Sequence, residues 1–199
     1  MTFWDKIAWL YDFAESFDSG AYKAMLEGIK QIVPEGANVL DCAAGTGELS
    51  IAAAEKAGHV LCTDMSLQML ERARKKSAKK GIKNISFEER DIFSLPDEDN
   101  TYDVSIAGNV LHLLDEPEKA VRELCRVTKQ GGRVIVPTFM AKNSNPLIKI
   151  YTLLGYRAFA CYTMESYEKM LKDCGCGRVK VTKISGLVPV AFGVIKVSK

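Results

Sequence analysis

The sequence predicts an α/β fold, in which helices cover both faces of a mostly parallel sheet. Between residues 38 and 136, short apolar segments typical of strands alternate with amphipathic segments typical of helices. Strands joined through helices imply right-handed crossovers and parallel pairing. The last two expected strands, 178–184 and 190–197, are separated by only five residues, too few for a crossover. We therefore expect a doubly wound, seven-stranded sheet that ends in an antiparallel C-terminal hairpin.

The composition is that of an ordinary globular protein. The chain has 199 residues, 47% hydrophobic and 26% charged, and a net charge of +2. It lacks the strong basic excess of proteins that mainly bind nucleic acid. It shows no leader pattern and no apolar run long enough to span a bilayer. We expect one cytoplasmic domain over residues 1–199, monomeric or homodimeric, without a nucleic-acid partner, stable membrane insertion or a metal site.

Two helices are expected before the first strand. Apolar residues between Phe3 and Ala14, and again between Tyr22 and Ile32, follow helical spacing, and Ser19-Gly20 separates the two sets. Pro34 and Gly36 end the second helix. The N-terminal residues 1–34 therefore precede the alternating part of the chain as a helical pair.

The alternating part then proceeds element by element. A buried strand over 38–42 leads through a turn of small residues, 43–47, into a helix over 48–56. A second strand at 59–64 precedes a helix for which Ser66 is the expected N-cap. The remaining elements are strands near 85–87, 102–107 and 133–136 and a helix near 117–127.

The turn after the first strand is the main candidate for ligand binding. Small residues let a ligand approach the backbone, and the start of the following helix offers unpaired N–H groups. A dinucleotide fingerprint needs a third glycine where this chain has Ser50, which weakens the pyrophosphate interpretation. Asp41 stands just before the turn, where a carboxylate repels phosphate and favours a cation. Asp64 ends the second strand, where a carboxylate can accept both hydroxyls of a ribose.

With these features the chain resembles the class I S-adenosylmethionine (SAM)-dependent methyltransferases over nearly its whole length. The first motif of that family, acidic-x-Gly-x-Gly-x-Gly, corresponds to Asp41, Ala43, Gly45 and Gly47, with alanine replacing the first glycine. The third motif is similar to residues 90–92, and the helix-to-strand-five signature is similar to residues 123–132. The resemblance implies a Rossmann-like fold, SAM as the cofactor and S-adenosylhomocysteine (SAH) as the product.

The resemblance also implies roles for individual residues. Asp64 would bind the ribose, and Met65 would lie against the adenine. Asp91 would receive the adenine amino group, and Ile92 would donate a backbone N–H to the ring. Asn109 would face the methionine end of the cofactor. The alternatives are structural: strand-end carboxylates, a core methionine and a turn asparagine.

Two segments are candidates for the substrate side. Residues 7–12 resemble the N-terminal lid of related methyltransferases, so residues 1–34 are expected to be lid helices, with Tyr11 at the cofactor. Residues 140–162 form an apolar insertion after the fifth strand, where loops usually line the acceptor pocket. Packing of this insertion on the sheet is the alternative.

Methyl transfer to a protonated acceptor needs a base, and His112 is the histidine on the ligand side of the expected sheet. We expect it to be a general base or a substrate contact, and packing beside the cofactor is the alternative. A basic run lies further back in the chain, where a solvated helix face is favoured over an RNA contact: Arg72, Arg74, Lys75, Lys76, Lys79, Lys80 and Lys83.

The expected function is methyl transfer from SAM to a small acceptor that is apolar, aromatic or lipid-like. Three alternatives remain open: an RNA or protein methyltransferase on the same fold, a catalytically silent SAM-binding module, and a nicotinamide-dependent oxidoreductase. The sequence does not indicate whether the acceptor atom is oxygen, nitrogen, carbon or sulfur.

Overall fold

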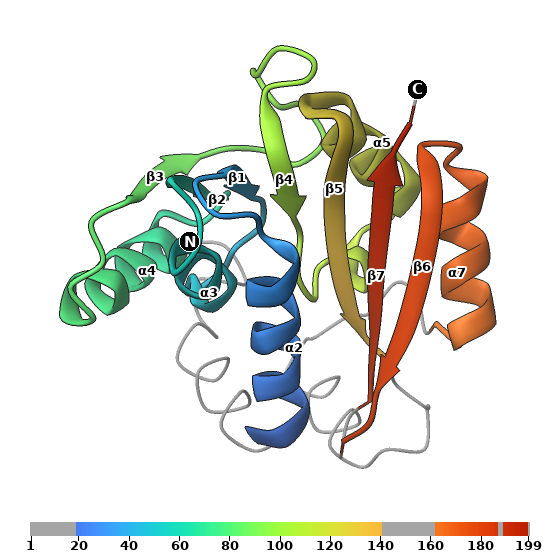
Figure 1. Ribbon diagram of the computed structural model, residues 1–199, viewed down its shortest axis with the longest axis horizontal. Helices are drawn as coiled ribbons and strands as arrows, with labels where there is room; N and C mark the ends of the chain where they lie inside the picture. The colour runs from blue at the N-terminus through green and yellow to red at the C-terminus, as the bar shows by residue number, and fades with distance from the viewer. Residues whose placement is uncertain (1–18, 141–161, 187–188, 199) are drawn as a thin grey trace.

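A seven-stranded sheet in the order β3-β2-β1-β4-β5-β7-β6 forms the centre of the molecule (Figure 1). The computed structural model describes residues 19–140, 162–186 and 189–198. Strand β7 (Val190–Val197) pairs antiparallel with β5 on one side and with β6 (Gly177–Ile184) on the other. The other pairings are parallel and join β1 (Asn38–Asp41), β2 (His59–Asp64), β3 (Ile85–Glu89), β4 (Tyr102–Ile106) and β5 (Thr128–Phe139). The expected fold class, including the antiparallel C-terminal hairpin, is confirmed.

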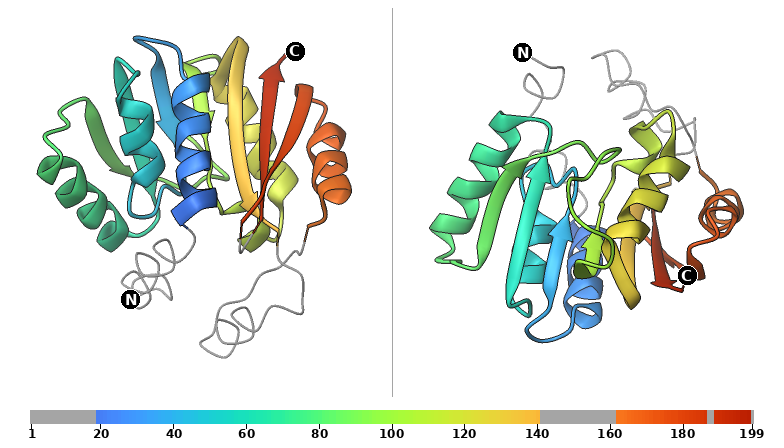
Figure 2. Two further views of the ribbon diagram at one scale, coloured as in Figure 1. Left: turned by 60° about the horizontal axis from the view of Figure 1, so that its bottom comes forward. Right: turned by 90° about the horizontal axis from the view of Figure 1, so that it is seen from above.

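Helices cover both faces of the sheet (Figure 2). One face carries α2 (Ser19–Ile32), α3 (Glu48–Ala54) and α4 (Leu67–Lys79), and the other carries α5 (Pro117–Val127) and α7 (Met164–Asp173). Met25 and Ile29 of α2 are completely buried against β1, β4 and β5. Leu124 and Leu171 fill the same role on the opposite face. Burial on both faces explains why the central strands are continuously apolar.

Local sequence signals account for where several helices begin. Ser66 caps α4 as expected, because its hydroxyl accepts the backbone N–H of Met69 at 3.3 Å. Helix α7 starts with a reciprocal capping box between Thr163 and Ser166. This helix was missed by the sequence reasoning, which placed helical character at 145–162 instead. Its apolar face is short, with Tyr167, Met170 and Leu171 as its buried residues.

Strand β5 is longer than expected, since it begins at Thr128 rather than at residue 133. Its register with β4 shifts between Tyr102 and Val104, which pair with Thr128 and Arg133. Gly131 has a left-handed φ of 75° at this point. Gly131 and Gly132 therefore lie at a bulge inside β5, whereas the sequence pattern placed the start of the strand directly after them.

Two expectations lie largely or wholly outside the described residues. Tyr11 and the first expected helix fall in residues 1–18, and most of the insertion falls in residues 141–161. Among the described helices, none combines the length and apolar character that a membrane span requires.

Candidate functional site

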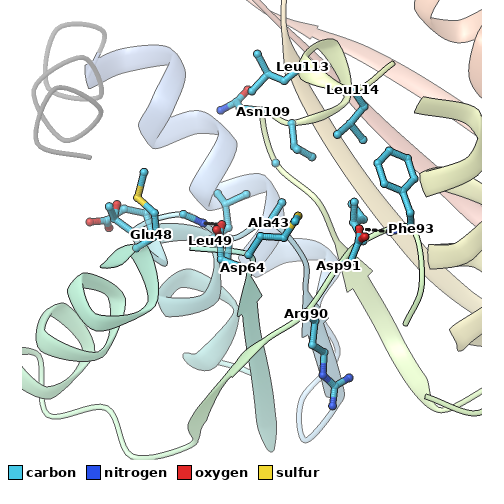
Figure 3. A pocket seen from close by; sticks show the side chains of 18 of the residues that line it. Ala43, Glu48, Leu49, Asp64, Arg90, Asp91, Phe93, Asn109, Leu113 and Leu114 are labelled. Carbon is cyan, nitrogen blue, oxygen red and sulfur yellow. Dashed lines mark hydrogen bonds between the residues drawn. The ribbon is translucent and has the colours of Figure 1, made fainter. Parts of the chain in front are cut away.

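A pocket opens at the carboxyl ends of β1, β2 and β4, where the strand order reverses (Figure 3). Its empty space, including the open mouth, is about 1090 Å³. The loops after β1 to β4 supply most of its walls, and α2 adds two side chains. The lining residues are Tyr22, Met25, Ala43, Ala44, Gly45, Thr46, Glu48, Leu49, Asp64, Met65, Met69, Arg90, Asp91, Ile92, Phe93, Gly108, Asn109, Val110, Leu113 and Leu114.

The turn after β1 has a backbone that only small residues adopt easily. Ala43, Gly45 and Gly47 have left-handed φ values of 50°, 56° and 81°. A Cβ atom on Gly47 would lie 2.7 Å from the Cβ atom of Ala73 in α4. The turn is therefore packed directly against α4, and its backbone faces the pocket.

Asp64 joins this turn to the next helix. Its Oδ2 atom accepts the backbone N–H of Gly45 at 2.9 Å, and its Oδ1 atom accepts the N–H of Ser66 at 2.8 Å. The side chain is half-buried and lines the pocket. A carboxylate has about four lone-pair positions, so both oxygens can still accept hydroxyl groups of a ligand. Met65 beside it is 64% exposed and lines the pocket, so its apolar side chain is accessible to a ligand.

The segment after β3 forms a second wall. Asp91 is exposed, and its Oδ1 atom accepts the backbone N–H of Phe93 at 2.9 Å. Ile92 is buried, with 5% exposure. Figure 3 shows Arg90 extending away from the other labelled side chains. Arg90 pairs instead with Glu88 and Asp97, so its charge is neutralised outside the pocket.

Two buried acceptor atoms near the pocket lack a hydrogen-bond partner within the described part of the chain: Asp41 Oδ1 and Asn109 Oδ1. They follow adjacent strands, since Asp41 ends β1 and Asn109 comes three residues after β4. Asn109 has a left-handed φ of 54°, and its N–H donates to the carbonyl of Pro137 at 2.7 Å. A buried acceptor without a donor is costly. Asn109 lines the pocket, so a ligand that brings a donor or positive charge could satisfy its oxygen, whereas Asp41 is fully buried and does not line the pocket.

Burial also controls the charge of Asp41. The carboxyl group is completely buried, which raises its pKa from 3.8 to about 7. The hydroxyl of Ser50 donates to Oδ2 at 2.6 Å and opposes this shift, whereas the nearby charge of Asp64 adds to it. Asp41 therefore lies close to its titration point at neutral pH, where a cationic ligand would favour the ionised form.

His112 lies behind the pocket wall rather than on its surface. It is 4% exposed and belongs to the short 3-10 helix η1 (Leu111–Leu113). Its Nδ1 atom is 2.9 Å from the hydroxyl oxygen of Thr138. Burial lowers its pKa from 6.5 to about 4, so the ring is neutral at pH 7. Its neighbours Leu113 and Leu114 line the pocket, and a catalytic role for His112 itself stays a prediction.

The structure brings most of the expected cofactor residues together. The pocket is lined by seven of them: Ala43, Gly45, Asp64, Met65, Asp91, Ile92 and Asn109. Asp41, which lies just before the turn, and Gly47, which ends it, are buried and do not line the pocket. The sequence reasoning missed Tyr22 and Met25 as pocket residues, because their helical spacing indicated only packing. The aromatic density of the N-terminal region was the available signal for Tyr22.

Together, the fold and the pocket define an α/β protein of the class I methyltransferase type, with acidic residues ending the first two strands around a small-residue turn. The chain belongs to the methyltransferase domain family, which matches residues 34–184. The expected family, that of the class I methyltransferases, is thus confirmed.

Individual relatives agree with this assignment. The chain is 39% identical over 106 residues to the ubiquinone/menaquinone biosynthesis C-methyltransferase UbiE of Bdellovibrio bacteriovorus, a match that covers 52% of this chain and 45% of the relative. It is 38% identical over 123 residues to the demethylmenaquinone methyltransferase of Renibacterium salmoninarum, covering 62% and 50%. The chain thus spans about half the length of these curated relatives.

A solved structure shows the same fold. The SAM-dependent methyltransferase from Aquifex aeolicus matches with a TM-score of 0.67 and 24% identity, over 85% of this chain and 88% of that chain.

Proposed function

We propose that this protein transfers the methyl group of SAM to a small aromatic or lipid-like acceptor in the pocket at the carboxyl ends of β1, β2 and β4. The observation that carries this proposal is the side-chain oxygen of Asn109, a buried acceptor without a partner among the described residues on a residue that lines the pocket. Asp41 is fully buried just before the turn and places an acidic group close to the same site. SAM brings both an ammonium group and a positively charged sulfonium. A phosphate-bearing dinucleotide would instead bring negative charge towards Asp41 and Asp64.

The other lining residues suit the nucleoside half of SAM. Asp64 has lone pairs left for the ribose hydroxyls after accepting the N–H groups of Gly45 and Ser66. Met65 and Ile92 offer apolar surface to a flat base, and the exposed carboxylate of Asp91 can accept its amino group. Each of these roles is the one that the motif resemblance implied.

A separate group of lining residues suits an apolar acceptor. Val110, Leu113 and Leu114 follow β4, and Tyr22 and Met25 come from α2. Among these described side chains, the phenol of Tyr22 is the group that can donate and accept a proton. The relatives named for quinone methylation support an aromatic, lipid-like acceptor such as a quinol.

SAM supplies a methyl group activated on a sulfonium, the acceptor takes this group and gives up a proton, and SAH remains. The contribution of the chain is mainly to hold both partners in line and to exclude water. Tyr22 is positioned to contact an acceptor hydroxyl, whereas neutral His112 supports the η1 segment through Thr138. We assign His112 to positioning on this basis.

Two measurements test the proposal. Calorimetry should detect binding of SAM and SAH but not of NAD, and NAD binding without SAM binding would overturn the cofactor assignment.

Methyl-labelled SAM should then label a 2-alkyl-naphthoquinol lacking the ring methyl group, with bulk tRNA and unfolded protein as controls. Label found only in RNA or protein would contradict the acceptor class, and SAM binding without transfer to any acceptor would indicate a silent binding module.

A further inference from the structure

Lys76 reaches from α4 to the turn that forms the floor of the pocket. Its Nζ atom donates to the hydroxyl of Thr46 at 2.8 Å and pairs with Glu48 Oε1 at 3.0 Å. Thr46 is 3% exposed and lies in the turn, and Glu48 is the first residue of α3. The side chain of Lys76 is only 26% exposed, in contrast to the solvated face expected for this basic run.

Helix α4 holds the turn at three successive levels. Just before the helix, Asp64 at the end of β2 accepts the N–H groups of both Gly45 and Ser66, and Ser66 is the N-cap of α4. In its middle, Ala73 packs against Gly47 so closely that a Cβ atom on Gly47 would lie 2.7 Å from the Cβ atom of Ala73. One turn later, Lys76 binds Thr46 and Glu48 on the same face of the helix, since residues three apart are neighbours.

Backbone hydrogen bonds give the turn part of its shape, since the N–H of Ala44 donates to the carbonyl of Thr63 and that of Gly47 to the carbonyl of Ala44, each at 2.9 Å. Three of its residues have left-handed φ values, and the hydroxyl of Thr46 is its polar side-chain group. Small side chains leave the backbone exposed to a ligand but provide few packing contacts of their own. A partly buried, charge-assisted hydrogen bond to that hydroxyl is therefore well placed to pre-organise the binding surface.

The same helix supplies a natural comparison. Lys80 lies one turn after Lys76 and pairs with the other oxygen of Glu48, at 3.7 Å. Its side chain is 54% exposed. Lys80 is the C-cap of α4. The two lysines share a charge and a carboxylate partner, but Lys76 also donates to the turn.

We propose that Lys76 is a positioning residue for the cofactor, which clamps Thr46 and Glu48 so that the turn is already shaped for SAM before binding. This inference rests on the proposed function, because it assumes that SAM occupies this turn. It predicts that Lys76 acts on cofactor affinity rather than on the chemical step, since the pocket is not lined by its side chain.

The first experiment compares Lys76→Met with Lys80→Met by calorimetry with SAM. We expect Lys76→Met to weaken SAM binding about tenfold, the effect of losing one charge-assisted hydrogen bond. We expect Lys80→Met to change it less than about twofold, as is usual for an exposed ion pair. At saturating SAM, kcat of Lys76→Met should be nearly unchanged, with the loss confined to KM. Equal SAM affinities of the two variants, or a loss in kcat with KM unchanged, would overturn the clamp.

The second experiment removes the acceptor of the hydrogen bond while keeping the lysine. Thr46→Val is nearly isosteric, and it should weaken SAM binding, by no more than Lys76→Met does. The double variant should be no weaker than Lys76→Met, because Thr46→Val removes one of the two contacts that Lys76→Met removes. Additive losses would mean that the two side chains act separately, which would contradict the inference. This variant also keeps the test valid if Lys76→Met does not fold.

Hydrogen exchange separates this inference from the proposed function. In the protein without ligand, the amides of Gly45 to Gly47 should exchange faster in Lys76→Met than in wild type, and Lys80→Met should match wild type. Unchanged exchange would overturn the clamp even if SAM binds. Absence of SAM binding by the wild-type protein would instead overturn the proposed function, and the exchange rates would still decide whether Lys76 holds the turn.

Discussion

The carboxylate of Asp64 accepts the backbone N–H of Gly45 at 2.9 Å, which ties the end of β2 to the turn after β1. The same carboxylate accepts the N–H of Ser66 at the start of α4. One side chain therefore organises two loops that come from different crossovers and meet at the pocket. The dependence of the turn on residues outside it leads to the following predictions.

Replacing Asp64 should damage both the fold and the site. Asp64→Ala leaves two N–H groups without an acceptor, so we expect the free energy of unfolding to fall by about 1–3 kcal/mol. SAM binding should weaken at least about tenfold through loss of one charge-assisted hydrogen bond. Glu89 pairs with Asp64 in register on β3 and does not line the pocket. Glu89→Ala is therefore the control, and equal effects of the two variants would rule out a special role for Asp64.

Ala43 should tolerate glycine better than its neighbour does. Its φ of 50° is left-handed, which costs a residue with a Cβ atom about 1–2 kcal/mol. Ala43→Gly removes that cost and offsets the added flexibility of the unfolded chain, so stability should be unchanged or slightly higher. Ala44→Gly gains no such relief and should lose about 0.5–1 kcal/mol. Denaturant unfolding of both variants checks the prediction, which a larger loss in Ala43→Gly would refute.

Stability should depend on pH through Asp41. Burial raises its folded-state pKa to about 7, whereas the unfolded value is near 3.8. The folded state therefore keeps a proton that the unfolded state has lost between these values. The free energy of unfolding should fall as pH rises from about 4 to 7, by at most about 1.4 kcal/mol per pH unit from this group. Asp41→Asn should flatten the dependence, and parallel curves for the two proteins would contradict the assignment.

His112 should not shape the pH dependence of turnover near neutrality. Its lowered pKa of about 4 keeps the ring neutral at any pH well above that value. His112→Ala should reduce turnover by disturbing the η1 segment, but its pH–rate profile should keep the wild-type shape between about pH 6 and 9. Disappearance of a limb of the profile in this variant would instead establish His112 as the general base.

Tyr22 should act on the acceptor and not on the cofactor. Tyr22→Phe keeps the ring that lines the pocket and removes the hydroxyl. We expect kcat/KM for a phenolic acceptor to fall by about ten- to a thousandfold, the range for loss of one hydrogen-bonding or proton-transfer group. The dissociation constant of SAM should stay the same. A weakened SAM affinity with normal use of the acceptor would place Tyr22 on the cofactor side instead.

Local patterns were enough to predict the order of the strands along the chain and seven of the residues that line the pocket. Strand spacing, the cap at Ser66 and the small residues of the turn depend on neighbours in the sequence, so they can be read without a structure. Parallel strands bring their carboxyl ends to one edge of the sheet. Asp41 and Asp64 end strands and Asp91 follows one, so all three lie at that edge. Helix α7 was missed although its apolar residues recur at helical spacing, with Tyr167, Met170 and Leu171 buried.

Only the tertiary structure decided which side chains line the pocket. His112 and Asn109 are three residues apart, yet one is packed behind the wall and the other lines the pocket. Lys76 looked like part of a solvated basic face, and its contacts with Thr46 and Glu48 join residues about 30 positions apart. The physical reason is that spacing along the chain determines backbone conformation, whereas burial, charge and long-range hydrogen bonds depend on which elements the sheet brings together.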